Sequence, residues 1–200
     1  MIESVIFDLG GVYFTDGTTR AIGQISATFG VPEESVHHVL MGDLGTRYRV
    51  GTITSGQFWE GARKHWGIEA SDQQLTALWL EAYEPIAGTV ALIDRLAAAG
   101  YELLYLSDNT RDRVDYLEAT YPFLHRFVAG VFSHDAGVRK PDPRIYELLL
   151  AKATHPATAC IYIDDKPAML VPAGKMGMTV IAFENPDQVE ADLVRHGLNF

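Results

Sequence analysis

Residues 2–14 read IESVIFDLGGVYF, an apolar run that Asp8 closes and two glycines follow. A short apolar run without alternation, rich in β-branched residues, predicts a strand that is buried on both faces. Ligands of open parallel sheets bind beyond the carboxyl ends of the strands. The stretch therefore predicts a first strand of an α/β sheet, with Asp8 at a candidate site.

Four further runs share this character, and helical patterns separate them. The predicted strands are residues 2–7, 102–106, 130–132, 160–163 and 178–183. Among the helical patterns, TVALIDRLAAAG ends on Gly100, the residue type that favours a helix C-cap. Alternation of strand and helix predicts an α/β fold, a parallel Rossmann-like sheet with helices on both faces.

Residues 15–84 interrupt this alternation. They contain the helical patterns AIGQISATFG, PEESVHHVLM, SGQFWEGARKHWG and SDQQLTALWLEAY, and no strand-like run. We therefore expect residues 15–84 to form a small all-helical cap domain inserted after the first strand. Residues 1–14 and 85–200 would form the core domain. Trp59, Trp66 and Trp79 are interpreted as the hydrophobic core of the cap.

The composition is that of a soluble globular protein and excludes several classes of partner. The 200 residues are 48% hydrophobic and 21% charged, and the formal net charge is -10. This acidity argues against nucleic acid and membrane surfaces, which need clustered Lys and Arg. Cys160 is the only cysteine, we interpret it as buried, and no signal peptide or membrane span is evident. We expect a cytoplasmic protein; the sequence does not indicate its oligomeric state.

Polar side chains follow four of the predicted strands. They are Asp8, the triplet Ser107-Asp108-Asn109, the triplet Ser133-His134-Asp135, and the pair Asp164-Asp165. Because the carboxyl ends of parallel strands share one edge, these residues are expected to converge. A single acid after a strand would be weak evidence, since it can cap a helix.

Three of these acids predict a metal site. Asp8, Asp164 and Asp165 would repel one another unless a cation lies among them or protons are taken up. Hard oxygen ligands suit Mg²⁺, which takes one or two carboxylates together with water and phosphate oxygens. Lys140, in the loop GVRKPDPRIY before a helix, is expected to join them.

The stretches FDLGGV, LSDNT, GVRKPDP and YIDDKP, in this order, resemble the four motifs of the haloacid dehalogenase (HAD) superfamily. The resemblance spans almost the whole chain, because residues 15–84 occupy the place of that superfamily's cap. A first motif that reads D-L-G is similar to that of small bacterial HAD phosphatases. The resemblance implies a phosphatase with a Mg²⁺ cofactor.

The resemblance also implies roles for individual residues. Asp8 would be the nucleophile that forms an aspartyl-phosphate, and Lys140 would pair with both Asp8 and the phosphate. The phosphate-binding residues would be Ser107, Asp108, Asn109 and Lys140, with nearby backbone N–H groups. The metal ligands would be Asp8, the main-chain carbonyl of Gly10, and Asp165, with Asp164 beside them.

Three positions depart from the superfamily pattern. Gly10 replaces the acid that protonates the leaving group, Asp108 replaces a common Asn, and Met169 replaces an Asp or Asn that supports the metal. A missing general acid costs about 10²–10⁴ in rate, so we hypothesise a preference for good leaving groups such as anomeric or acyl oxygens. Asp16 and Asp108 are possible substitute acids, but we interpret them as a turn residue and a helix-start acid.

The glycine pair Gly10-Gly11 has a backbone interpretation, because glycines permit positive φ and close approach of main chain to a ligand. Arg47 and Arg49 of the cap, with Tyr48 between them, are interpreted as solvated surface, with substrate contact as the alternative. The sequence thus predicts a Mg²⁺-dependent phosphatase for a small phosphorylated metabolite, with a sugar phosphate as one candidate. The alternatives are a metal-independent 2-haloacid dehalogenase and a non-catalytic phosphate-binding protein.

Overall fold

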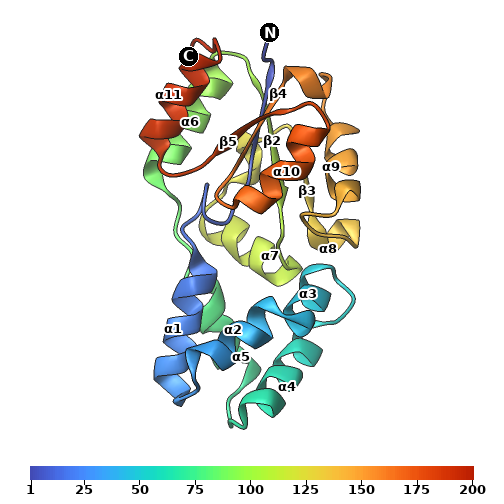
Figure 1. The fold of residues 1–200 in the computed structure, drawn as a ribbon. Helices are drawn as coiled ribbons and strands as arrows, with labels where there is room; N and C mark the ends of the chain where they lie inside the picture. The colour runs from blue at the N-terminus through green and yellow to red at the C-terminus, as the bar shows by residue number, and fades with distance from the viewer.

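Five parallel strands form a sheet at one end of the molecule (Figure 1). The computed structural model describes all residues 1–200. The strands are β1 (Ser4–Phe7), β2 (Glu102–Ser107), β3 (Ala129–Phe132), β4 (Cys160–Asp164) and β5 (Thr179–Ala182). Their order is β3-β2-β1-β4-β5, so β1 lies at the centre. The five predicted strands are confirmed, each with ends within two residues of the prediction.

Helices cover both faces of the sheet. Alternate side chains of each strand point to opposite sides, and the apolar side chains on both sides are buried against these helices. Val5 and Phe7 belong to the larger hydrophobic cluster, which includes residues of helices α6 (Ala87–Ala98) and α11 (Pro186–Arg195). Ile6 belongs to the second cluster, with residues of helices α9 (Pro143–Leu150) and α10 (Pro167–Lys175). The predicted Rossmann-like α/β class is confirmed.

Strand β5 differs from its expected environment. It pairs only with β4, and of its four residues only Ile181 is buried, while Val180 is 38% exposed. The expectation that all five strands are buried on both faces is therefore wrong for β5. As an edge strand it has a neighbour on one side only, which leaves part of its surface to solvent.

Helices α1 to α5 gather at the other end of the molecule (Figure 1). They are α1 (Gly17–Phe29), α2 (Glu33–Met41), α3 (Asp43–Arg49), α4 (Ser55–Trp66) and α5 (Asp72–Leu80). Capping boxes at Thr54 and Ser71 begin α4 and α5. Trp59, Trp66 and Trp79 are buried among these helices, as predicted. Helix α3, a short helix that follows directly on Gly42, was not predicted from the sequence.

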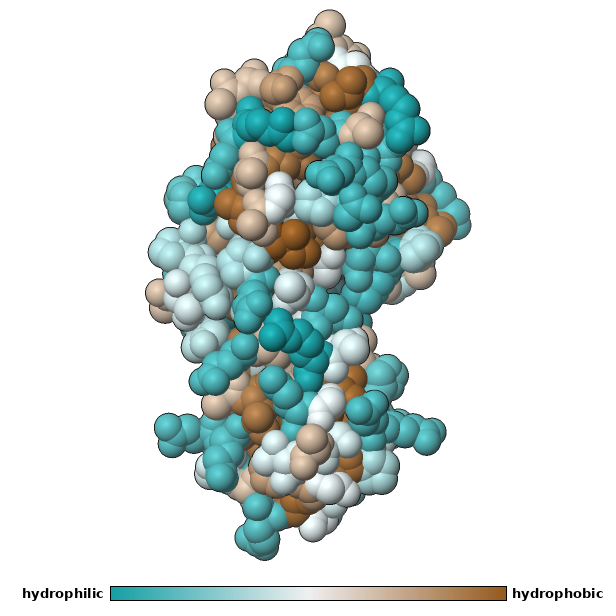
Figure 2. All heavy atoms as spheres, turned by 90° about the vertical axis from the view of Figure 1, so that its left-hand side faces the viewer, coloured by the Kyte–Doolittle hydropathy of each residue, from teal (hydrophilic) through white to brown (hydrophobic).

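Two neighbouring stretches of chain connect the ends of the molecule. Thr15 N–H donates to the Glu84 carbonyl at 2.9 Å, and Ile86 N–H donates to the Tyr13 carbonyl at 2.8 Å. In Figure 2 the molecule narrows between its two ends, and hydrophilic residues cover much of this waist. We propose that the cap domain comprises residues 15–84 and the core domain residues 1–14 and 85–200, since the chain leaves and re-enters the core at this pair.

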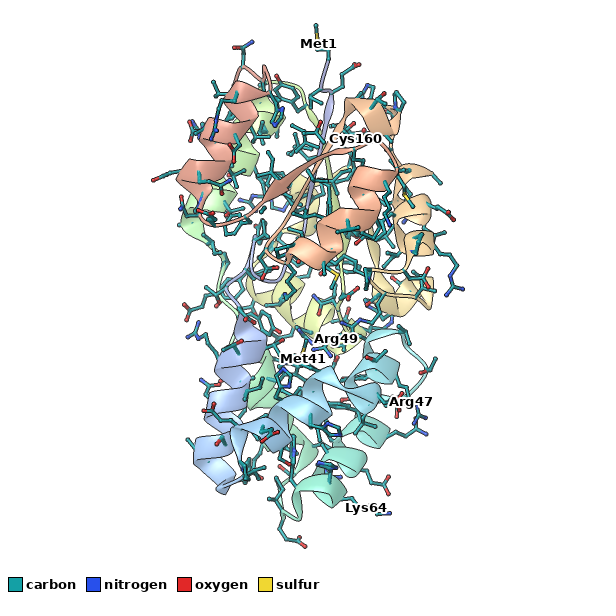
Figure 3. All side chains as sticks on the ribbon, viewed as in Figure 1. Met1, Met41, Arg47, Arg49, Lys64 and Cys160 are labelled. Carbon is teal, nitrogen blue, oxygen red and sulfur yellow. The ribbon has the colours of Figure 1, made fainter.

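None of the helices combines the length and hydrophobicity that crossing a membrane requires. Cys160 lies on β4 inside the sheet (Figure 3), fully buried as the sequence predicts. Burial raises the pKa of its thiol.

Candidate active site

Two adjacent strands, β1 and β4, bring three of the predicted acids together. The pairing of β1 with β4 sets Phe7 opposite Ile163, so Asp8 and Asp164 follow at neighbouring strand ends. Asp8, Asp164 and Asp165 each offer a carboxylate oxygen, and these oxygens all lie within 4.8 Å of one another. Asp8 and Asp164 are buried, and the side chain of Asp165 is 23% exposed. The convergence expected of these three acids therefore occurs, but Asp135, which was expected to join them, pairs instead with Arg111 in an exposed position.

The clustered acids disfavour one another's charges. Burial raises the pKa of Asp8 to about 7, and the Asp164 carboxylate adds to this rise, while Lys140 opposes it. Burial also raises the pKa of Asp165, with a further contribution from Asp164, while Lys166 lowers it. Bringing a divalent cation among three such carboxylates would relieve their repulsion, and their oxygens are the donors that Mg²⁺ prefers. The residues present therefore fit a Mg²⁺ ion.

Lys140 joins this cluster from the loop that precedes α9, one short helix after β3. Its Nζ lies 3.0 Å from Asp8 Oδ1, 2.6 Å from Asp164 Oδ2, and 3.0 Å from the Tyr162 hydroxyl. The side chain is only 3% exposed. Burial works to lower the pKa of Lys140, but the nearby carboxylates outweigh it and hold this pKa well above the ordinary value. Lys140 is thus a buried cation in contact with two of the acids.

The loop after Asp8 turns back on itself through its backbone. Leu9 N–H donates to Asp8 Oδ1 at 2.7 Å, and Gly11 N–H donates to the Phe14 carbonyl at 2.8 Å. Gly11 has a φ of +89°, and a Cβ there would lie 2.5 Å from Asp165 Oδ2. Positive φ and close approach therefore belong to Gly11 and not to Gly10, which corrects the interpretation of the pair. A Cβ on Gly10 would meet nothing within 4 Å.

Asp8 and Lys140 line a cavity, and the residues at and just beyond the end of β2 form one polar wall of it. Ser107 and Asn109 are buried there, and the backbone N–H of Asn109 is already engaged, since it donates to Ser133 Oγ at 2.9 Å. Asp108 accepts from Arg139 Nε and from Lys140 N–H, both at 3.0 Å. It does not start a helix, since α7 (Arg111–Thr120) begins three residues later, so the interpretation as a helix-start acid is wrong.

Asp16 and Met169 also border the cavity. Asp16 is exposed and is the N-cap of α1, accepting from Thr19 N–H at 3.2 Å, so it is a helix cap and not merely a turn residue. Met169 lies on α10, and its carbonyl accepts a hydrogen bond from the Tyr146 hydroxyl at 2.6 Å. The Met169 side chain is uncharged, so this position adds no further carboxylate to the three of the acid cluster.

The cap closes the cavity from the side opposite Asp8. Figure 3 shows Met41 and Arg49 where the helical end faces the sheet, while Arg47 points outward. Arg49 is only 3% exposed and its Nη1 donates to the Leu40 carbonyl, and Tyr48 is buried as well. The interpretation of this segment as solvated surface is therefore wrong for Tyr48 and Arg49 and holds for Arg47. The local pattern could not show it, because burial here comes from α3 packing between α2 and α4 of the cap and helix 133–136 of the core.

Four ionisable residues that line the cavity were not predicted from the sequence. They are Tyr83 at the end of the cap, Arg113 on α7, Arg139 and Lys166. Lys166 Nζ lies 3.3 Å from Asp165 Oδ1. Arg139 and Lys166 were detectable as neighbours of Lys140 and Asp165 in their motifs. Arg113 carried no signal, because it is one of several charged residues on a polar helix. The cavity has a volume of about 130 Å³.

The fold and the acid cluster define a Rossmann-like α/β enzyme core with a helical cap. The family model for haloacid dehalogenase-like hydrolases matches residues 2–177, and the chain belongs to this family of hydrolases. The resemblance noted in the four motifs is thereby confirmed.

Relatives by sequence cover most of this chain. An uncharacterized protein of Dictyostelium discoideum is 29% identical over 150 residues, which are 73% of this chain and 65% of that protein. Flavin mononucleotide hydrolase 1 of Arabidopsis thaliana is 27% identical over 88% of this chain and 71% of its own length. The chain thus spans less than two thirds of the Dictyostelium relative.

Solved structures show the same fold. A HAD family enzyme of Bacteroides thetaiotaomicron, in complex with magnesium and inorganic phosphate, matches with a TM-score of 0.77 and 22% identity, over 92% of this chain and 95% of that chain. The L-2-haloacid dehalogenase of Xanthobacter autotrophicus matches with a TM-score of 0.67 and 19% identity, over 99% of this chain and 84% of that chain. At these identities the likeness concerns the fold, which phosphate-binding and dehalogenase members share.

Proposed function

We propose that this hydrolase is a Mg²⁺-dependent phosphatase for a small phosphorylated metabolite. The observation that carries the proposal is the contact of Lys140 with Asp8 beside two further acids of the same cluster. This arrangement supports the proposal, because a carboxylate, a fixed cation and further carboxylate oxygens lie at one point. The Arabidopsis relative is named as a hydrolase of flavin mononucleotide, and the Bacteroides structure contains magnesium and inorganic phosphate; both support phosphate chemistry.

In the proposed reaction Asp8 attacks phosphorus and the bond from phosphorus to the leaving oxygen breaks. The product is an aspartyl-phosphate on Asp8, which water hydrolyses to release inorganic phosphate and regenerate the carboxylate. Lys140 holds Asp8 in place and contributes positive charge beside the phosphoryl oxygens. Ser107, Asn109 and Asp108 are proposed to border the phosphoryl group, the hydroxyl of Ser107 as a donor.

Asp8, Asp165 and the Gly10 carbonyl are the proposed ligands of Mg²⁺, with Asp164 beside them. When bound, the ion supplies charge neutralisation of the phosphoryl oxygens. Asp164 contacts Lys140 at 2.6 Å and accepts from Lys166 N–H at 2.9 Å. We therefore propose that Asp164 chiefly positions Lys140, and that Asp8 and Asp165 present their oxygens to the metal.

The cavity favours a small substrate. Its volume of about 130 Å³ lies below the roughly 300–1,000 Å³ of pockets that enclose drug-sized ligands. A phosphorylated metabolite of a few carbons, or a single sugar phosphate held partly outside the cavity, fits this limit better than a nucleotide.

The alternative activity is dehalogenation of a 2-haloacid. The Xanthobacter dehalogenase shares the fold, so the fold alone does not distinguish the two activities. Dehalogenation requires Asp8 to displace halide from carbon and needs no metal. Without a cation, two more acids beside Asp8 would repel the carboxylate of a haloacid, whereas Mg²⁺ held by these acids would offset the repulsion of a phosphate, which argues for the phosphatase.

A substrate panel with and without metal separates these activities. We expect phosphate release from p-nitrophenyl phosphate and acetyl phosphate in Mg²⁺, and a loss of about 10²-fold or more after chelation, since charge neutralisation by the metal is removed. Halide release from 2-chloropropionate that persists after chelation would establish the dehalogenase instead. Binding of a phosphoryl mimic in Mg²⁺, without turnover of either class, would identify a non-catalytic protein.

Restoring an acid at Gly10 tests the role of the missing proton donor. Because a side chain at position 10 meets open space, Gly10→Asp should fold and raise hydrolysis of alkyl phosphates by about tenfold or more, within the range of general-acid catalysis. Acetyl phosphate, whose leaving group needs no proton, should gain little. The rates of both substrates in both proteins are the measurement.

The matched control is Gly11→Ala in the next position. A Cβ there would clash with Asp165 and require a strained φ, so activity should fall on both substrates. Equal alkyl and acetyl phosphate rates in the unmodified protein would contradict the proposed preference for good leaving groups.

A further inference from the structure

Two buried arginines border the cavity on the side away from the acid cluster. Arg49, from α3, and Arg113, from α7, are each 3% exposed and line the same cavity as Asp8. The other cations of this cavity have acidic partners; Arg139, for example, pairs with Asp108 and Lys140 with Asp8. Neither Arg49 nor Arg113 forms a salt bridge, although the chain has 26 acidic residues. Buried charges without a partner are costly, so an anion is the expected complement.

Arg113 is held as a rigid group. Its guanidinium carbon lies 4.4 Å from the ring centre of Trp79 and 4.8 Å from that of Tyr83, and its Nη1 donates to the Tyr83 hydroxyl. Aromatic contact on this scale fixes the plane of a guanidinium. The plane is therefore set before any ligand arrives.

Two donors of Arg113 lack a partner. The buried Nε and Nη2 make no hydrogen bond. These two nitrogens form one edge of the guanidinium, the fork that binds a carboxylate or phosphate through two parallel hydrogen bonds. Buried donors without acceptors are rare in native proteins, which gives this edge the character of a binding group.

Arg49 adds a second positive charge beside the first. Its Nη1 donates to the Leu40 carbonyl at 2.5 Å, and its guanidinium carbon lies 5.5 Å from the centre of the same Trp79 ring. Burial lowers the pKa of Arg49 to about 10, and the charge of Arg113 contributes to this fall. The two guanidinium groups thus repel each other beside Trp79, and an anion between them would relieve that repulsion.

We propose that the substrate carries a second anionic group, a carboxylate or a second phosphate, which Arg113 binds with Arg49 while the first phosphate meets Asp8. The inference rests on the proposed phosphatase function and specifies its substrate class. The small cavity that both Asp8 and Arg113 line keeps the two anionic groups within one small molecule. A neutral analogue would leave the Nε–Nη2 edge of Arg113 without an acceptor, and this cost would make the site select the anionic substrate.

Three sugar phosphates with the same leaving group test the proposal. Glucose 1-phosphate, glucuronic acid 1-phosphate and glucose 1,6-bisphosphate differ only in a hydroxyl, a carboxylate or a phosphate at carbon 6. We expect kcat/KM for one of the anionic compounds to exceed that for glucose 1-phosphate by about 30-fold or more, the scale of a buried charged hydrogen-bonded pair. The preferred compound identifies the second group as carboxylate or phosphate.

Substitutions on α7 assign the preference to Arg113. Arg113→Gln should reduce the ratio of anionic to neutral kcat/KM towards one, mainly through KM, and Arg113→Lys should keep an intermediate ratio because it retains the charge without the fork. Arg111→Gln is the control on the same helix, since Arg111 is exposed and pairs with Asp135 outside the cavity. This variant should keep the ratio of the unmodified protein.

Each result decides the proposal. One result would contradict only the second anionic group: the protein hydrolyses p-nitrophenyl phosphate in Mg²⁺, but kcat/KM is equal for all three sugars. The proposed phosphatase function would then still hold. An equal loss on all three sugars in Arg113→Gln would also contradict the second anionic group, because a merely structural arginine acts in that way. Absence of turnover of p-nitrophenyl and acetyl phosphate in Mg²⁺ would overturn the phosphatase and this inference together. Should Arg113→Gln not fold, the sugar series on the unmodified protein and Arg113→Lys still decide.

Discussion

Replacing Asp8 with asparagine is expected to reduce phosphate release by about 10⁴-fold or more, the scale seen when a nucleophile is removed from an enzyme. The amide has the shape of the carboxylate but cannot attack phosphorus. The amide side chain retains an oxygen that can accept from Leu9 N–H, a hydrogen bond that Asp8 accepts at 2.7 Å. The measurement is single-turnover phosphate release in Mg²⁺ from acetyl phosphate.

The same variant should remain folded. Burial disfavours the charged form of Asp8, so a neutral side chain removes that cost, and Lys140 keeps its contact of 2.6 Å with Asp164. We expect a melting temperature at or above that of the unmodified protein. Asp187→Asn, at an exposed acid in the first turn of α11, is the control and should alter neither property. Activity retained in Asp8→Asn would show that Asp8 is not the nucleophile.

Replacing Lys140 with methionine has the second-largest expected effect. The rate should fall by about 10²–10³, as it does when a preorganised electrostatic donor is lost. Stability should fall by about 3–5 kcal/mol, since removing one partner leaves buried Asp164 and Asp8 without their cation. Activity assays and denaturant unfolding measure the two effects.

A double variant separates these two effects. Lys140→Met combined with Asp164→Asn removes the most buried of the unpaired charges, so most of the lost stability should return. Activity should not return, because the positive charge beside Asp8 is still missing. Lys64→Met, at an exposed lysine of α4, is the control and should change neither measurement. Recovery of activity in the double variant would limit Lys140 to a structural role.

Much of the core site was predictable because it depends on local pattern and parallel topology. Each acid of the cluster lies at the end of an apolar run, and parallel strands place their carboxyl ends at one edge. Lys140 was predictable from its position in a proline-fixed loop before α9. The side-chain geometry was not: the pairing of Asp108 with Arg139 and the positive φ at Gly11 depend on where the folded loops meet.

The cap side of the cavity was not predictable in this way. Arg113 looks in sequence like a solvated residue of a polar helix, and Arg49 looks like part of an exposed cap segment. Both are buried because α5 and α3 pack against α7 and α8 (Ser133–Ala136), which places Trp79 over Arg113. No local periodicity records such a contact, since it joins residues far apart in the chain.

The stretch IESVIFDLGGVYF and its three companion motifs determined the α/β fold, the acid cluster and the expectation of phosphoryl transfer. They suffice because hydrophobic periodicity and chain direction are local properties that a linear sequence displays. The tertiary structure alone decided which charges are buried without a partner and which glycine has room for a side chain. Burial and pairing are sums over neighbours from the whole chain, and only the packed cap and core bring those neighbours together.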